Sequence, residues 1–200
     1  MLQRAVETSS RVGEVVESAT DRCVVQCYHL YQSPPLGTLV VTRSPTVYGV
    51  VSHISTESLY PGRPVVARGE GEETEEDVYR SNPQLGRLLC TRFETRVLGH
   101  SEDGTIRHGL PPLPPPVHAF AHQCSYDEVR EFTLSLYFLP LLLEGQQARV
   151  DEVAVASLLR AAEAHPDRRG FLLAAGKALA ALLASDLPRL DALLRRISPR

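Results

Sequence analysis

The chain has 200 residues, of which 43% are hydrophobic and 22% charged, and its formal net charge at pH 7 is -3. This composition is typical of a globular protein, and the length accommodates one sizeable domain or two small ones. Residues 1–117 carry the whole net charge and residues 118–200 are neutral overall. Neither part therefore has the basic excess typical of nucleic-acid-binding proteins.

The first ten residues, the short apolar runs and the spacing of the cysteines indicate a cytoplasmic protein. Residues 1–10 contain no apolar run, so we expect neither a secretory signal nor an anchor there. No apolar run approaches the ~20 residues that a spanning helix requires, so membrane insertion is not expected. Cys23 and Cys27 would lie roughly 13 Å apart on one strand, which is too far for a disulfide.

The stretch from residue 12 to residue 54 has the pattern of short β-strands separated by polar turns. Residues 11–17 and 22–29 are rich in valine and flank a polar connection, which predicts a hairpin. Two further strands are predicted at residues 36–42 and 47–55. Short strands at close spacing favour a small antiparallel sandwich or barrel.

An acidic segment follows an irregular, proline-containing connection at residues 57–69. Residues 70–77 hold six acidic side chains, which could form an acidic docking surface or a cation site. Glu72, Glu73 and Glu75 are then candidate partner-binding residues. The favoured alternative is a solvated helix face, because the carboxylates lack the spacing of calcium ligands.

The same segment should form short helices within residues 70–89. Val78 and Tyr79 are expected to be the buried edge of the acidic helix. Asn82 and Pro83 predict the start of a second helical turn, with proline at its first position.

Residues 91–99 form the clearest predicted strand, with Phe93, Thr95 and Val97 on the face toward the core. A turn and a short partner strand at residues 105–108 follow. Five prolines between residues 111 and 116 cannot continue a central strand, so we expect the barrel to end before them.

The proline run favours polyproline II and a semi-rigid spacer. It could bind an aromatic groove of the SH3 type, which makes four prolines candidate partner-binding residues: Pro111, Pro112, Pro114 and Pro115. The favoured alternative is a linker packed along the barrel.

From Ser125 the apolar period changes to about 3.6, which is typical of helices. Ser125 and Glu128 form a capping box, and this helix is predicted to run to Pro140. Further helices are predicted at residues 151–166 and 167–184, and one after a cap at Asp186. We therefore predict an α+β protein with two parts: a Greek-key-like antiparallel β-barrel (9–123) and an α-helical C-terminal bundle (124–200).

No catalytic, cofactor or metal site is predicted. Gly170 to Lys177 resembles a phosphate loop, but the glycine spacing is too long, Ala178 replaces the hydroxyl residue, and the segment lies in a helical pattern. Scattered histidines and cysteines could be metal ligands, but they form no Cys-x-x-Cys pair and no complete set. These residues are His118, His122 and Cys124, and Cys23, Cys27, His29 and His53. Cys90 and Cys124 are expected to be buried as small hydrophobes.

Three short segments resemble the HAS barrel, a family named for HerA-type DNA-translocating ATPases and ATP synthases. They are residues 12–15 (VGEV), 35–40 (PLGTLV) and 47–54 (VYGVVSHI). The order of elements is similar to stand-alone HAS-barrel proteins of photosynthetic bacteria, in which a proline-rich joint and a helical tail follow the barrel. Gly13, Gly37 and Gly49 match the motif glycines, which we expect at strand bends or close backbone approaches.

The resemblance implies a docking role, because barrels of this family cap an ATPase ring or receive a partner while a separate module binds nucleotide. That module is absent from these residues, so the resemblance implies no ATPase activity here. We expect a non-enzymatic docking or assembly module that binds a protein partner, such as an ATPase, or itself. One alternative is a barrel that binds single-stranded nucleic acid, which would require a basic groove with exposed aromatics. Another is an enzyme of unrecognised class, which would require a deep pocket with converging polar groups.

Overall fold

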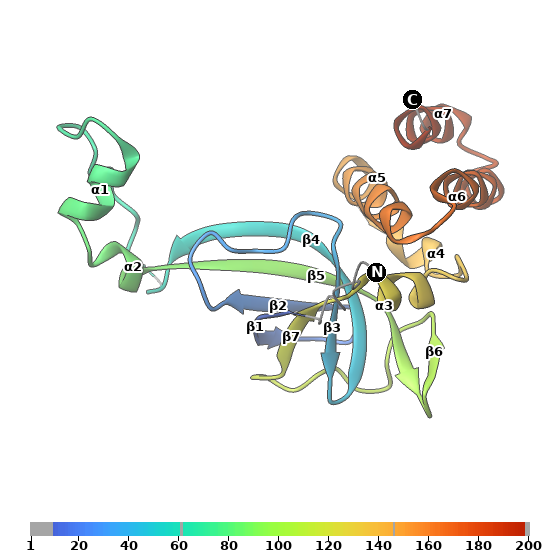
Figure 1. The fold of residues 1–200 in the computed structure, drawn as a ribbon, viewed down its shortest axis with the longest axis horizontal. Helices are drawn as coiled ribbons and strands as arrows, with labels where there is room; N and C mark the ends of the chain where they lie inside the picture. Colours follow the sequence, from blue (N-terminus) through green and yellow to red (C-terminus); the bar gives the residue numbers. More distant parts are fainter. Residues whose placement is uncertain (1–9, 61, 146, 199–200) are drawn as a thin grey trace, which may run out of the picture.

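The structure is a computed structural model that describes residues 10–60, 62–145 and 147–198. Within these ranges six antiparallel strands close into a barrel, as predicted (Figure 1). The order around the ring is β1, β7, β3, β4, β5, β2, and β2 returns to β1, while β6 pairs with β5 outside the ring. The strands are β1 (Arg11–Ser18), β2 (Arg22–Cys27), β3 (Leu39–Arg43), β4 (Thr46–Ser58), β5 (Leu89–Glu102), β6 (Thr105–Arg107) and β7 (Phe120–Gln123).

The alternation predicted for residues 91–99 is confirmed. Phe93, Thr95 and Val97 are buried, and the intervening side chains are half-buried. The inward residues pack with Val15 and Val25 in a core inside the barrel. β5 is longer than predicted because its pairing with β4 continues as far as the Ser58–Leu89 pair.

β7 corrects the prediction that the barrel ends at the prolines. It follows the proline run and pairs with β1 on one side and with β3 on the other. Ala121 is its inward residue and is 1% exposed, while Phe120 points outward. Four residues carry too little alternation to indicate a strand, and the two neighbouring strands supply the pairing that forms it.

The helices are α1 (Glu75–Ser81), α2 (Leu85–Leu88), α3 (Tyr126–Phe132), α4 (Leu139–Leu142), α5 (Gln147–Ala164), α6 (Arg168–Leu182) and α7 (Leu187–Ile197). Both hydrogen bonds of the predicted capping box at Ser125 are present. The helix predicted to run from Ser125 to Pro140 ends at Phe132 instead. Pro140 lies in the first turn of α4, where the backbone N–H that proline lacks would have no intrahelical partner. None of the described helices combines the length and apolar character needed to cross a bilayer.

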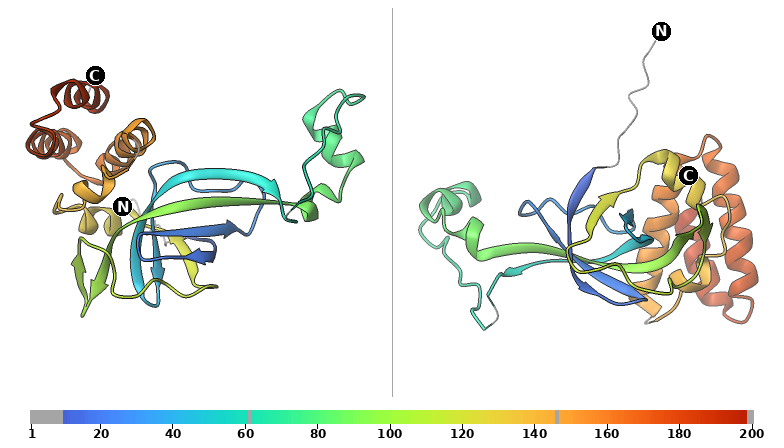
Figure 2. Two further views of the ribbon diagram at one scale, coloured as in Figure 1. Left: turned by 180° about the vertical axis from the view of Figure 1, so that it is seen from behind. Right: turned by 90° about the horizontal axis from the view of Figure 1, so that it is seen from below.

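The C-terminal helices pack on the outer face of the barrel and share a core with it. This core joins outward residues of β3, β4 and β5 to residues of α3 and α5, including Tyr48, Leu98, Phe132 and Leu158. The rings of Tyr48 and Phe132 are in direct contact, with 4.9 Å between their centroids. Figures 1 and 2 show α5, α6 and α7 stacked at one end of the molecule, beside the barrel.

Candidate functional site

A projecting arm is the most distinctive surface feature. We define the arm as residues 56–60 and 62–91, which comprise the outer ends of β4 and β5, the connection after β4, and helices α1 and α2. Along the arm, β5 pairs with β4 alone, because its pairing with β2 ends at Arg92 and its pairing with β6 lies at the opposite end of the strand. Figures 1 and 2 show the arm extending away from the barrel, at the end opposite α5 to α7.

The tip of the arm has almost no core of its own. Among residues 62–88 only Leu85 is buried, and every residue from Arg63 to Glu70 is exposed. Tyr31 of the β2–β3 loop supports the arm from outside. Its backbone N–H donates to Thr91 Oγ1 at 2.8 Å, and its ring lies edge-on to Tyr79 with 6.2 Å between centroids.

The acidic residues lie on the tip, only partly in a helix. Thr74 caps α1 by accepting the backbone N–H of Asp77 at 3.2 Å, and the first turn of α1 carries three acidic side chains, which the helix dipole favours. Of the three candidate residues, Glu73 and Glu75 are exposed and Glu72 is half-buried. No group of three or more potential metal ligands occurs in the described ranges.

Two local predictions for the arm are wrong. α1 buries none of its residues, so Tyr79 is 37% exposed instead of forming a buried edge. Asn82 ends α1, and Pro83 lies in the turn before α2 instead of opening that helix. The first prediction assumed a core on which α1 packs, and the projecting arm offers α1 none.

An exposed apolar pair on the arm was missed by the sequence analysis. Val65 and Val66 are 58% and 62% exposed in the connection between β4 and α1. They border a groove of about 230 Å³ whose other wall includes Leu85 and Leu88. The sequence did carry a signal for this exposed pair, namely two adjacent β-branched residues within a connection rich in proline and glycine.

The proline run packs as a strap across the barrel. Pro111 and Pro115 are buried, Pro114 is half-buried and Pro112 is exposed. The carbonyl of Pro115 accepts a hydrogen bond from the Ser18 hydroxyl, and the Pro115 ring borders the barrel interior. Of the four candidate prolines, only Pro112 and Pro114 therefore offer ring surface to a partner without movement of the strap.

The three motif glycines lie where backbones approach closely. A Cβ at Gly13 would collide with the backbone carbonyl of Gln26 on the neighbouring strand. Gly37 has φ of +80°, and a Cβ there would lie 2.5 Å from the backbone nitrogen of Ser157 on α5. Gly49 lies at a register shift between β4 and β5. Packing accounts for all three without a ligand.

The candidate metal ligands do not come together within the described ranges. Cys23 and Cys27 face the barrel interior, whereas His118 is exposed and bonds Glu14 through Nδ1 at 3.0 Å. All four cysteines are free and buried, as expected for Cys90 and Cys124. Burial raises the pKa of Cys27 to about 11, and it raises the pKa of Cys23 as well, which favours the unreactive thiol.

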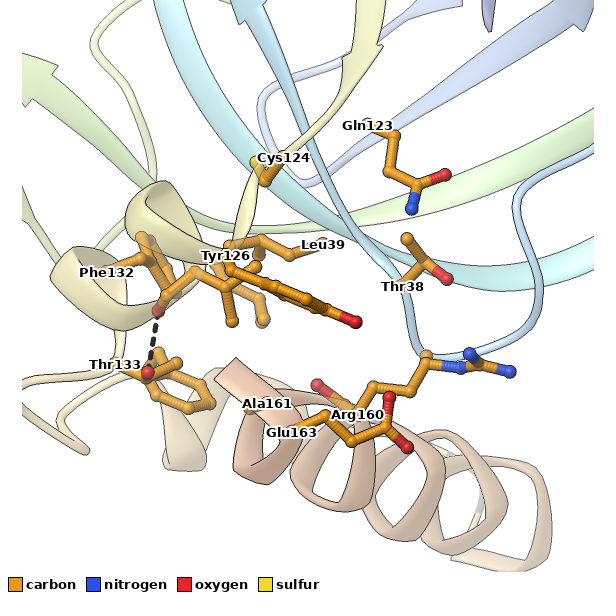
Figure 3. Close-up of a pocket in the computed structure, with 15 residues that line it drawn as sticks. Thr38, Leu39, Gln123, Cys124, Tyr126, Phe132, Thr133, Arg160, Ala161 and Glu163 are labelled. Atoms are coloured by element: carbon orange, nitrogen blue, oxygen red, sulfur yellow. Dashed lines mark hydrogen bonds between the residues drawn. The ribbon is translucent and has the colours of Figure 1, made fainter. Parts of the chain in front are cut away.

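A pocket lies at the seam between the barrel and the helices, and we call it the seam pocket (Figure 3). Its volume is about 140 Å³, and its walls come from β3, β5, the end of β7, α3 and α5. Figure 3 shows Tyr126 between Thr38 on the barrel side and Arg160 and Glu163 on the α5 side. The Arg160 Nε–H donates to the Leu36 carbonyl at 2.9 Å, which joins α5 to the loop before β3.

A broader, polar cleft of about 640 Å³ lies on another part of the seam, between the β1–β2 turn, β5 and the end of α4. Its charged residues are Asp21, Arg22, Glu94, Arg96 and Glu144. The Arg96 guanidinium donates to the backbone carbonyls of Leu141, at 3.3 Å, and Glu144, and so fastens the helices to the barrel. The volume of this cleft falls within the range of small-molecule pockets.

Aromatic rings are exposed on the outer face of β1, β2 and β7. The Arg11 guanidinium lies 4.4 Å from the ring centroid of Phe120 and 5.0 Å from that of Tyr28. Both rings are more than 40% exposed. Glu14 accepts the Tyr28 hydroxyl at 3.0 Å on the same face, so the aromatic surface is not part of a uniformly basic groove.

Comparisons with known proteins add no family to this description. No protein-family model matches the chain, and no curated protein has a significantly similar sequence.

Proposed function

We propose that this protein is a non-enzymatic docking module, in which a HAS-like barrel with its packed helices presents the arm to a partner protein. In this role it would be an adaptor for an ATPase or another multi-subunit assembly. The observation that carries the proposal is the arm tip, where only Leu85 is buried among residues 62–88. Ordering such a segment costs conformational entropy that its own packing offsets little, and a bound partner would supply the missing burial.

The chemistry of the tip favours a partner with a basic, partly apolar surface. Val65 and Val66 offer exposed apolar surface, and six carboxylates lie between Glu70 and Asp77. Complementary charge steers association and suppresses wrong partners, while the apolar pair supplies the buried centre of an interface. The excess of carboxylates on the tip disfavours pairing between the tips of two copies.

A cytoplasmic location belongs to the same proposal. Cys23, Cys27, Cys90 and Cys124 are all free thiols, which fits a reducing compartment. The buried state of these thiols also supports a role that uses no cysteine nucleophile.

The test compares three forms of the full chain as bait in a lysate of the source cells: wild type, a Val65→Ser/Val66→Ser variant, and a control. Leu134→Ser is the matched control, because Leu134 is 77% exposed and lies in the turn after α3, outside the arm. A protein that is lost with the arm variant and kept with the control is then purified. Its affinity for each form is measured directly over a range of salt concentrations.

We expect the arm variant to raise the dissociation constant by at least about tenfold, which is the effect of removing a pair of hot-spot residues from an interface. Replacing Glu72, Glu73 and Glu75 by glutamine should weaken binding most at low salt. Equal binding to all three forms would refute the arm as the docking surface. A dimer seen by light scattering that the arm variant abolishes would instead make the partner a second copy of this chain.

The nucleic-acid alternative has one observation in its favour, the exposed rings of Tyr28 and Phe120 beside Arg11. Base stacking on such rings contributes to single-strand binding, but it normally accompanies a basic groove. We expect no binding of a labelled oligothymidine at 50 mM salt in a fluorescence anisotropy titration. Salt-dependent binding that Phe120→Ala abolishes would favour the alternative.

A further inference from the structure

The seam pocket has a buried, apolar lining of limited volume. Leu39, Leu98, Phe132 and Ala161 belong to this lining, and all four are buried. The volume of about 140 Å³ is close to the ~150 Å³ of an engineered apolar cavity that holds benzene. The pocket therefore accepts an apolar group of about the size of a benzene ring or a leucine side chain.

The mouth of the pocket carries one cation and one anion that do not pair with each other. Arg160 and Glu163 line the pocket, both are exposed, and they lie about one turn apart on α5. The Arg160 Nε–H donates to the Leu36 carbonyl, and its two Nη groups have no partner among the described residues. Glu163 forms no hydrogen bond or ion pair through its side chain within the same ranges. Figure 3 shows both side chains on the side of the pocket toward which the Tyr126 hydroxyl points.

We propose that the seam pocket binds a free α-amino acid with an apolar side chain of about the size of leucine. The side chain of the ligand lies against the apolar lining, its carboxylate binds the Nη groups of Arg160, and its ammonium group binds Glu163. Arginine suits this role because its N–H groups match the two oxygens of a carboxylate. This site does not involve the arm, and it stands or fails independently of the docking function.

The position of the charges favours a ligand with both an ammonium group and a carboxylate. An ion placed wholly inside the apolar lining would lose its hydration. At the exposed mouth the two charged groups of an amino acid stay in contact with water, so only its side chain is desolvated. A ligand with a single charge would pair with one of Arg160 and Glu163 and face a like charge on the other.

The experiment titrates L-leucine and three analogues into the full chain, with binding followed by ligand-observed NMR. L-Leucine should bind at least about tenfold more tightly than L-alanine, because its side chain has three more carbon atoms to bury. 4-Methylpentanoate lacks the ammonium group, and 3-methylbutylamine lacks the carboxylate. Each should bind roughly 1.4- to 5-fold more weakly than L-leucine, which is the range of an exposed ion pair.

Variants assign each group of the ligand to its residue. Glu163→Gln should remove the preference for L-leucine over 4-methylpentanoate, and Arg160→Gln should remove the preference over 3-methylbutylamine. Glu17→Gln changes an exposed carboxylate of β1 outside the pocket and should keep both preferences. Ala161→Leu fills the pocket and should abolish binding of L-leucine, whereas Ala174→Leu enlarges an exposed alanine of α6 and should leave it unchanged. Circular dichroism confirms that each variant is folded.

Several outcomes would overturn the proposal. L-Leucine would then fail to bind wild type, or would bind it no more tightly than L-alanine or 4-methylpentanoate. A Glu163→Gln variant that still prefers L-leucine over 4-methylpentanoate would remove the role of the carboxylate at the mouth. Unchanged binding of L-leucine to a folded Ala161→Leu variant would place the ligand outside the seam pocket.

Discussion

Truncation of Phe132 should destabilise the barrel and the helices together. Phe132 is 1% exposed, and its ring contacts Tyr48 of β4, His108 and Phe138, with centroid distances of 4.9, 4.8 and 5.4 Å. A buried Phe→Ala change costs about 3 to 5 kcal/mol of unfolding free energy, and the three ring contacts place this site in the upper part of that range. At about 2 to 4 °C per kcal/mol, the melting temperature should fall by roughly 8 to 20 °C.

Thermal melting followed by circular dichroism measures the size of this effect. Hydrogen exchange then shows whether β4 and α5 lose protection together, as a shared core requires. Tyr137→Ala is the matched control, because Tyr137 is an aromatic residue of the same region that is 82% exposed and should change stability little. The shared core would be refuted if, in the Phe132→Ala protein, the helices exchanged freely while β4 kept its wild-type protection.

Three further predictions concern the same fold. Gly37→Ala should lower the unfolding free energy by about 2 kcal/mol or more in urea titrations, because φ is +80° and the new Cβ would meet the backbone of α5; an unchanged midpoint would contradict this. Burial lowers the pKa of His108 and His165 below their ordinary value of 6.5, so neutral imidazoles are favoured in the folded state. Stability present above pH 6.5 should therefore decline as the pH falls toward 5, and a His108→Gln/His165→Gln variant should show a smaller decline. Asp151→Asn should lower the unfolding free energy by about 2 kcal/mol, because Asp151 accepts two hydrogen bonds from Arg189 at 2.7 and 2.9 Å. Both side chains are mostly buried, so this loss should depend little on salt, and a loss that disappears at high salt would contradict the prediction.

The candidate sites were only partly visible in the sequence. The acidic residues and the prolines stand out in composition, but nothing local shows that Pro111 and Pro115 turn inward while Val65 and Val66 turn outward. The seam pocket had no sequence signal at all. Thr38 lies directly before β3, and α5, more than 100 positions later in the chain, closes over it.

Local patterns by themselves determined the fold class, most of the strands and the three long helices. The alternation within residues 91–99 and the capping box at Ser125 are properties of adjacent residues, so they can be read without knowing the rest of the chain. Only the tertiary structure decided that β7 completes the barrel, that Pro140 begins a helix, and that the arm stands clear of the core. The physical reason is that these features depend on partners distant in sequence, because a four-residue strand forms when β1 and β3 flank it and a surface is exposed when nothing covers it.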